Sequence, residues 1–263
     1  MDNLIEGLAT LKKYVYQAGQ VIFQMTTEGF ETAYKTHKDP VTTADLKANS
    51  ILREGLLKEF PNTGWLSEET RDDFSRLEKR LVWIVDPIDG TKEFVSGIPE
   101  YAVSVALVEN GLPILAAVYN PASKELFTAA IGQGIWLNDE IINSERELKP
   151  KPLILASRSE IKRGEFKPFE SSTRIRPCGS IAYKLALVAA GMADATFSLG
   201  PKNEWDIAAG VLLVKESGGN STNLNGTSFI FNQRKTLVNG IVAATKQAFS
   251  SITTLIEHET SSK

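Results

Sequence analysis

Cysteine and histidine are scarce in this sequence, and long apolar runs are missing. Its 263 residues include one cysteine and two histidines, so no disulfide can form within the chain. No stretch approaches the roughly 18 consecutive apolar residues that predict a membrane-spanning helix. Residues 1–20 also lack the basic and then apolar layout of a secretory signal. We therefore expect a cytoplasmic protein without a membrane partner.

Basic residues form no cluster. The chain has 29 Lys and Arg against 32 Asp and Glu, a net charge of −3, and no run dense enough to be the positive surface of a nucleic-acid-binding protein. The hydrophobic content of 42% is ordinary for a folded globular chain, and the length allows one large domain or two modest ones. These features disfavour a nucleic-acid polymer and favour a small-molecule partner.

The motifs of several enzyme classes are absent. The chain has no G-x-S-x-G and no P-loop GK[ST], and Gly132-Gln133-Gly134 lacks the third glycine of a dinucleotide-binding motif. His37 lies in a polar loop and His258 near the end of the chain, which disfavours a catalytic base. Cys178 is better explained as a buried, inert thiol than as a nucleophile. Covalent hydrolysis is therefore disfavoured.

Apolar spacing predicts the order of elements in the first half. Residues 4–22 and 46–57 follow helical spacing, so two helices open the chain. From Leu81 the spacing becomes strand-like, with Asn110-Gly111 as a hairpin turn signal. Short turns between consecutive strands predict an antiparallel sheet. The predicted strands are LVWIV, YAVSVALV, LPILAAVY, ELFTAA and GIWL.

The charged, proline-containing segment INSERELKPKP predicts a boundary at about residue 150. It separates an α+β half (1–150), with the antiparallel sheet and most candidate metal ligands, from an α/β half (151–263). The second half is predicted to contain strands LILAS, RIRP, DATFSL and NGIVAAT, with helices SIAYKLALVAAG and EWDIAAGVLLVKESGG. Together the halves predict a layered, mixed α/β architecture.

An apolar strand that ends in two aspartates is the most informative feature, in WIVDPIDGTKEF. Pro87 cannot continue a sheet ladder, so we expect the strand to end there, and Gly90 permits a turn that most residues resist. Such a turn can aim the carboxylates of Asp86 and Asp89 and the carbonyl of Ile88 at one point. Clustered oxygens of this kind are the ligands of Mg²⁺. A surface turn with two capping aspartates is the alternative.

Further acidic residues lie at a distance along the chain. Glu68 and Glu69 follow a turn, and Glu204 and Asp206 open a predicted helix. Each has an ordinary explanation, as a solvated loop charge or as an acid that interacts with the amino-terminal helix dipole. These explanations account for the residues singly and not for their association.

Four segments together carry a family resemblance: DPVTTAD (39–45), LSEE (66–69), WIVDPIDGT (83–91) and WDIAAG (205–210). In order and approximate spacing they resemble the signature of the inositol monophosphatase superfamily, over nearly the whole chain. The resemblance implies a magnesium-dependent, lithium-sensitive phosphomonoesterase. It also implies a layered αβαβα sandwich of the inositol monophosphatase and fructose-1,6-bisphosphatase type, and family members are often homodimers.

The resemblance implies a role for each matching residue. One Mg²⁺ is expected on Glu68, Asp86 and the Ile88 carbonyl, a second on Asp86, Asp89 and Asp206, and a third, weaker ion through Glu68 and water. Asp45 and Thr91 match the family's water activators, with Glu68 a further catalytic residue. The expected substrate contacts are Asp89, Gly90, Thr91, Gly179, Ser180 and Asp206, with the phosphate on the Gly90 and Thr91 amides.

Three details favour the 3'(2'),5'-bisphosphate nucleotidase branch, which converts adenosine 3',5'-bisphosphate to AMP and phosphate. They are Lys92-Glu93-Phe94, the stretch GPKNEWD (200–206) with the pair of segments LSEE (66–69) and SRS (157–159), and Leu199, where inositol phosphatases place a glutamate that binds ring hydroxyls. The stretches SGIPEYAVSVAL and NGIVAAT are equally similar to inositol phosphatases. Inositol-1-monophosphatase, or a related sugar or histidinol phosphate phosphatase, is therefore the alternative. A non-catalytic metal- or phosphate-binding protein is the second.

Overall fold

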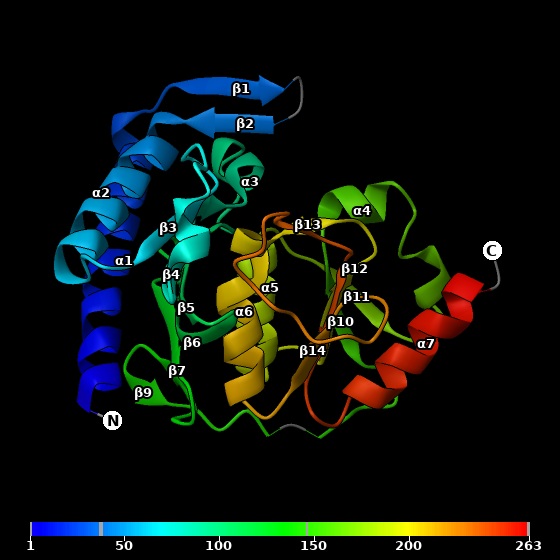
Figure 1. Ribbon diagram of the computed structural model, residues 1–263. Helices are drawn as coiled ribbons and strands as arrows, with labels where there is room; N and C mark the ends of the chain where they lie inside the picture. The colour runs from blue at the N-terminus through cyan, green and yellow to red at the C-terminus, as the bar shows by residue number, and fades with distance from the viewer. Residues whose placement is uncertain (1, 37–38, 146, 262–263) are drawn as a thin grey trace.

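The computed structural model describes residues 2–36, 39–145 and 147–261. Two sheets alternate with three layers of helices (Figure 1). Helices α1 (Asp2–Glu28) and α2 (Thr43–Glu59) cover one face of a seven-stranded sheet. Helices α5 (Ile181–Ala189) and α6 (Glu204–Glu216) lie between this sheet and a five-stranded one, whose outer face packs against α7 (Phe249–Ser261). The predicted αβαβα sandwich is confirmed.

The seven-stranded sheet has the order β3-β4-β5-β6-β7-β8-β9. It is antiparallel as predicted, except that β3 runs parallel to β4. The predicted strands are present, whereas β3 and β9 were not predicted. The strand bounds are β3 Gly64–Ser67, β4 Leu81–Asp89, β5 Ala102–Glu109, β6 Leu112–Asn120, β7 Glu125–Ala130, β8 Ile135–Leu137 and β9 Glu140–Ile141.

The expectation that Pro87 ends its strand is wrong. Strand β4 continues to Asp89, and its register against β5 shifts between the pairs Asp86–Ser104 and Asp89–Ala102. Three residue steps on β4 therefore face two on β5, which is a β-bulge. The bulge accommodates proline, because it relieves Pro87 of the ladder hydrogen bond that proline cannot donate.

Side chains on β4 point alternately to its two faces, so the strand contributes to the hydrophobic core on each side of the sheet. Trp83 and Val85 pack in the cluster that α1 and α2 cover, while Val82 and Ile84 pack in the cluster that contains α5 and α6. All four side chains are buried. A strand buried on both faces holds its carboxyl end rigidly, because rotation would disturb two close-packed cores.

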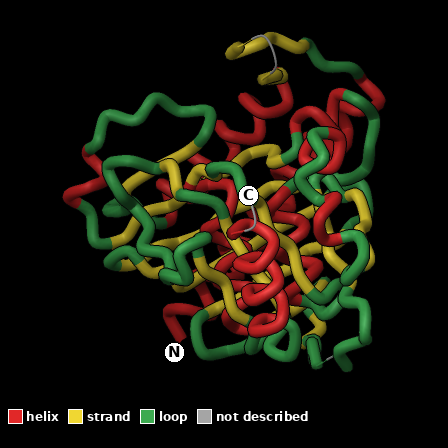
Figure 2. Tube along the Cα trace, turned by 90° about the vertical axis from the view of Figure 1, so that its right-hand side faces the viewer, coloured by secondary structure: helices red, strands yellow, loops and turns green. Residues whose placement is uncertain are grey.

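The five-stranded sheet has the order β11-β10-β12-β16-β14. Strand β10 pairs in parallel with β11 and β12, and β16 pairs antiparallel with β12 and β14. Figure 2 shows α7 in front of this sheet as an outer element. The strand bounds are β10 Leu153–Ala156, β11 Arg174–Pro177, β12 Ala195–Ser198, β14 Asn220–Thr222 and β16 Ile241–Ala244.

Short elements complete the fold. The hairpin β1 (Thr32–Thr36) and β2 (Asp39–Thr42) projects beside α3 (Thr91–Val95). Strands β13 (Lys202–Asn203) and β15 (Leu237–Val238) form a two-stranded sheet. The polar stretch before β11 contains α4 (Arg158–Lys162) and the 3₁₀ helix η2 (Lys167–Phe169), and a second 3₁₀ helix, η1 (Ser75–Glu78), precedes β4.

The segment near residue 150 connects β9 of the first sheet to β10 of the second. The central cluster contains Ala106 of β5 as well as Leu155 of β10, so residues from both halves form one core around α5 and α6. The division into domains 1–150 and 151–263 stays a prediction. Within the described ranges, no helix is long and apolar enough to cross a membrane.

A buried arginine links segments that lie far apart in the sequence. Arg76 of η1 is 1% exposed and donates hydrogen bonds to Asp72 (2.8 Å), to Oδ1 of Asn232 (2.6 Å) and to the carbonyl of Gln233 (2.9 Å). Glu204, the first residue of α6, accepts the backbone N–H groups of Asn232 (2.6 Å) and Gln233 (2.8 Å). We call these five residues the Arg76 clamp. It ties the segment after β3 to the start of α6.

We expect Arg76→Met to lower the free energy of unfolding by about 3 kcal/mol, because it leaves buried acceptors without their charged donor. Denaturant unfolding measures this change. Arg80→Met is the matched control: its side chain is 74% exposed and pairs with Glu109 at 2.5 Å, so a loss below about 1 kcal/mol is expected. Equal losses in the two variants would contradict a structural role for the clamp.

Candidate active site

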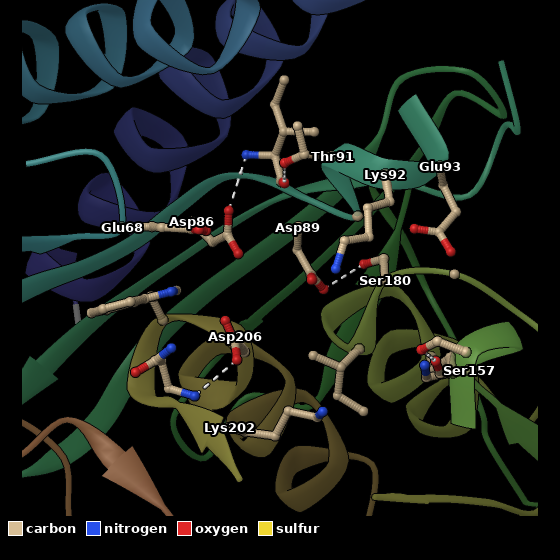
Figure 3. A pocket seen from close by; sticks show the side chains of 18 of the residues that line it. Glu68, Asp86, Asp89, Thr91, Lys92, Glu93, Ser157, Ser180, Lys202 and Asp206 are labelled. Atoms are coloured by element: carbon tan, nitrogen blue, oxygen red, sulfur yellow. Dashed lines mark hydrogen bonds between the residues drawn. The ribbon is translucent and has the colours of Figure 1, made fainter. Parts of the chain in front are cut away.

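One polar pocket of about 450 Å³ receives residues from both halves of the chain. Glu68 follows β3, Asp86 to Asp89 end β4, Gly179 and Ser180 precede α5, and Asp206 lies in the first turn of α6. Figure 3 shows the side chains of Glu68, Asp86, Asp89, Ser180 and Asp206 converging on the pocket. All the candidate site residues line it except Asp45, which reaches it through Thr91.

A glycine is required where β4 turns into α3. Gly90 has φ +94°, and a Cβ atom there would lie 3.0 Å from the carbonyl oxygen of Glu100 and 3.4 Å from Cβ of Ser180. A side chain would therefore meet both strain and close contact. The turn lets α3 begin at Thr91.

Asp89 is anchored to the start of α5. Its Oδ2 accepts hydrogen bonds from the hydroxyl of Ser180 and from the backbone N–H of Ala182, both at 2.6 Å. Ser180 also caps α5 by accepting the N–H of Tyr183 at 3.0 Å. Ser180 was predicted as a substrate contact, which stays a prediction, and its hydroxyl donates a hydrogen bond to Asp89. The hydrogen bond joins residues 91 positions apart, so no local sequence pattern could predict it.

Asp86 and Asp206 each use one carboxylate oxygen locally. The Ile88 N–H donates to Oδ1 of Asp86 at 3.1 Å, and the Asn203 N–H donates to Oδ2 of Asp206 at 2.8 Å. The second contact belongs to a capping box that begins α6. Figure 3 shows the other oxygens of Asp86 and Asp206 pointing toward each other across the pocket.

Burial dominates the electrostatics of these carboxyls, and mutual repulsion adds to it at Asp86 and Asp206. Burial raises the pKa of Asp86 well above its ordinary value, and the charges of Glu68, Asp89 and Asp206 raise it further. Burial, together with the charge of Asp89, raises the pKa of Asp206 to about 8. Burial also raises the pKa of Asp89, although Ser180 and Ala182 oppose the shift through their hydrogen bonds. A bound cation would favour the charged forms.

The candidate metal ligands are of the chemical type that magnesium prefers. Carboxylates and the Ile88 carbonyl supply only oxygen, which a hard cation prefers. Their present arrangement is different: among the described residues, no three Asp, Glu, His or Cys side chains are grouped to hold a metal ion. Asp89 and Asp206 each have an oxygen engaged by protein donors, and the Ile88 carbonyl accepts from Thr91 at 2.9 Å.

Asp45 and Thr91 form a hydrogen-bonded pair at the pocket edge. The Thr91 hydroxyl lies 3.1 Å from Oδ1 of Asp45, and Oδ2 of Asp45 accepts both the N–H (2.7 Å) and the hydroxyl (2.6 Å) of Thr42. Thr42 caps α2, so the capping box of that helix fixes the orientation of Asp45. Burial raises the pKa of Asp45, which makes its carboxylate a better proton acceptor.

A lysine that the sequence did not single out contacts the acidic pair. Lys35 of β1 lies 2.9 Å from Glu68 and 2.6 Å from Glu69. Burial alone would lower the pKa of Lys35, but its hydrogen bond with Glu69 and the charge of Glu68 hold it above the ordinary value. The β1–β2 hairpin therefore supplies a positive charge beside Glu68.

Three lysines also line the pocket, at Lys92, Lys184 and Lys202. Lys184 is buried, and burial lowers its pKa. Cys178 is 3% exposed, and burial raises the pKa of its thiol to about 12, as expected of an inert cysteine. Leu199 packs against the cluster beneath α7 and does not line the pocket.

The predicted positions of the two histidines can be checked in part. His37 lies outside the described residues. His258 is on α7, and its side chain is 77% exposed beside Glu259.

Comparison with known proteins adds independent findings. The inositol monophosphatase family matches residues 3–260. An inositol-1-monophosphatase of Rhizobium meliloti is 36% identical over 230 residues, which cover 83% of this chain and 86% of the relative. A protein of Xylella fastidiosa named Nus factor SuhB is 35% identical over 79% of this chain and 78% of its own length. The structure of an inositol monophosphatase of Thermotoga maritima superposes with a TM-score of 0.84 at 28% identity, covering 100% and 99% of the two chains.

We expect the metal-free protein to lose stability as the pH rises from about 4 to about 8. The pKa of Asp206 rises from 3.8 in the unfolded chain to about 8 in the folded one, so the folded state holds more protons across this window. Each proton lost then favours unfolding. Asp86 and Asp89 shift in the same direction.

The midpoint temperature of thermal unfolding, measured in excess EDTA, should fall as the pH rises from about 4 to about 8. Asp206→Asn should reduce the fall, because it removes one titrating group and keeps an oxygen for the α6 cap. Added Mg²⁺ should reduce it as well, since the cation favours charged carboxylates. The same pH dependence in Asp206→Asn and in the parent protein would contradict the assignment.

Proposed function

The chain belongs to the inositol monophosphatase family, and from this premise we propose that it removes the 3'-phosphate of adenosine 3',5'-bisphosphate. At the family level it is a phosphatase, and magnesium dependence and lithium sensitivity are typical of such enzymes. One observation carries the proposal: carboxylates from segments remote in the sequence line one pocket beside the hydrogen-bonded pair Thr91–Asp45.

In this proposal Glu68, Asp86 and the Ile88 carbonyl hold one Mg²⁺, and Asp86, Asp89 and Asp206 hold a second. A third ion binds more weakly through Glu68. When bound, the metal supplies positive charge for the phosphate oxygens and for the activation of water. The raised pKa values of Asp86 and Asp206 support these roles, because a bound cation would stabilise carboxylates whose charged forms are disfavoured by burial and, further, by neighbouring acids.

Thr91 and Asp45 handle the proton of the attacking water. The Thr91 hydroxyl lies 3.1 Å from Oδ1 of Asp45 and 2.9 Å from the Ile88 carbonyl. With its single proton directed to Asp45, the hydroxyl can accept a proton from water as its own proton passes to the carboxylate. Thr42 holds Asp45 in this orientation through two hydrogen bonds to Oδ2. Attack by water needs no covalent intermediate, which agrees with the absence of a nucleophile motif from the sequence.

The phosphate rests on the backbone amides of Gly90 and Thr91, with Gly179 and Ser180 beside it. Lys92 and Lys202 line the same pocket and add positive charge for an ester with more than one phosphate. Leu199, packed among apolar residues, offers no carboxylate for ring hydroxyls. These features support a nucleoside bisphosphate.

Inositol 1-phosphate is the second candidate substrate. The name of the Rhizobium meliloti relative and the Thermotoga maritima structure favour it. A panel of four esters separates the candidates: adenosine 3',5'-bisphosphate, inositol 1-phosphate, fructose 1,6-bisphosphate and histidinol phosphate. Phosphate release should depend on Mg²⁺ and be fastest from the first. No Mg²⁺-dependent release from any ester would favour a non-catalytic binding protein.

We expect Asp89→Asn to abolish nearly all phosphate release while the protein remains folded. The amide removes a negative charge that the second cation needs, but its oxygen can still accept from Ser180 and Ala182. Circular dichroism checks the fold and a phosphate assay checks the rate. Asp139→Asn, on an exposed side chain paired with Lys12, is the control and should behave as the parent enzyme. Near-normal turnover of Asp89→Asn would refute the proposed metal site.

Thr91→Ala should lower kcat by about 100-fold, because it removes the hydroxyl that connects water to Asp45. The Mg²⁺ concentration for half-maximal rate should change much less, since Thr91 supplies no carboxylate. Thr91→Ser should restore most of the rate. If the rate and the Mg²⁺ requirement changed equally in Thr91→Ala, its role would be structural.

A further inference from the structure

A second groove adjoins the catalytic pocket and shares part of its wall. It has a volume of about 750 Å³ and lies between the β1–β2 hairpin, α3 and α4. Pro40, Lys92 and Ser159 line both the groove and the pocket. A ligand whose phosphate is in the pocket can therefore extend into the groove without leaving the protein surface.

The groove is basic, in contrast to the acidic floor of the pocket. Among the side chains that the structure describes, Lys92, Lys162 and Arg163 line it and no acidic one does. Arg163 pairs with Glu165 at 2.5 Å, whereas within the described ranges neither Lys92 nor Lys162 forms an ion pair. Two uncompensated ammonium groups on the walls favour a negatively charged occupant.

The groove also carries an exposed aromatic ring. Tyr34 of β1 is 63% exposed, and in the described part of the chain it has no aromatic partner. Val95, 36% exposed on α3, lines the same groove. A large exposed ring with an apolar neighbour offers a surface on which a planar group can stack.

We propose that this groove binds the leaving group of the substrate, with a second anionic group on Lys162 and Lys92 and a planar base on Tyr34. The inference rests on the proposed function, since it assigns the part of a nucleoside bisphosphate that stays outside the catalytic pocket. A monophosphate of a cyclic polyol has neither the second anion nor the base, and would leave the groove empty.

The first test compares two substrates that differ only in the 5'-phosphate. Adenosine 3',5'-bisphosphate should exceed adenosine 3'-monophosphate in kcat/KM by about tenfold or more, as expected for a charge-assisted contact. Lys162→Ala should remove most of this preference, and Lys162→Arg should retain it. Lys246→Ala is the matched control, because Lys246 is exposed at the opposite end of β16 from the pocket, and it should keep the parent preference.

The second test addresses the ring. Tyr34→Ala should lower kcat/KM for both adenosine substrates by about fivefold or more, relative to inositol 1-phosphate, because it removes one stacked base contact. Tyr34→Phe should behave as the parent enzyme. An equal loss for inositol 1-phosphate would mean that Tyr34 supports the hairpin and not the base.

Failure of the groove assignment can be told from failure of the proposed function. If the parent enzyme releases phosphate but Lys162→Ala keeps its substrate preference, the groove assignment alone is overturned. If no ester is hydrolysed, the proposed function fails, and calorimetric titration with adenosine 5'-monophosphate still tests the groove. Binding that Lys162→Ala weakens about tenfold supports the groove, and equal binding or none overturns it.

Discussion

Repulsion among carboxylates confined to one pocket is the constraint on which the rest of the structure depends. Asp86, Asp89 and Asp206 come from β4 and α6, and burial and mutual charge disfavour their ionised forms. A chain free to relax would separate them, because charges that lose water repel more strongly. The fold prevents this separation, and the stored repulsion makes the pocket selective for positive charge.

The layers supply the necessary rigidity. Strand β4 is packed on both faces, so its carboxyl end cannot swing outward. Each aspartate is then fixed by backbone donors: Asp89 by the start of α5, and Asp206 by the capping box of α6. The backbone N–H groups at the starts of α5 and α6 find hydrogen-bond acceptors in these aspartates. The same contacts therefore hold the acidic side chains in place. The hairpin and α4 enclose the outer side, where the surface changes from acidic to basic.

Apolar spacing predicted the elements whose packing follows local pattern, such as α1, α6 and β4 to β8. It missed α7, whose Ser- and Thr-rich sequence has modest helix propensity and which forms by packing Ile252 and Ile256 onto the second sheet. The end of β4 was misjudged because a bulge depends on the partner strand. Local turn chemistry predicted that Asp86, Ile88 and Asp89 lie together, whereas the roles of the remote site residues Asp45, Glu68 and Asp206 came from motif resemblance. Lys35 and the Ser180–Asp89 contact had no local signal, since tertiary structure creates them.

The Arg76 clamp can form only late in the synthesis of the chain. Arg76 and Gln233 are 157 positions apart, and the entropy of closing so long a loop must be overcome before their hydrogen bond forms. On a ribosome, a nascent chain that stops short of residue 232 holds Arg76 and Glu204 without their shared partners. The segment after β3 and the start of α6 are then not joined by the clamp.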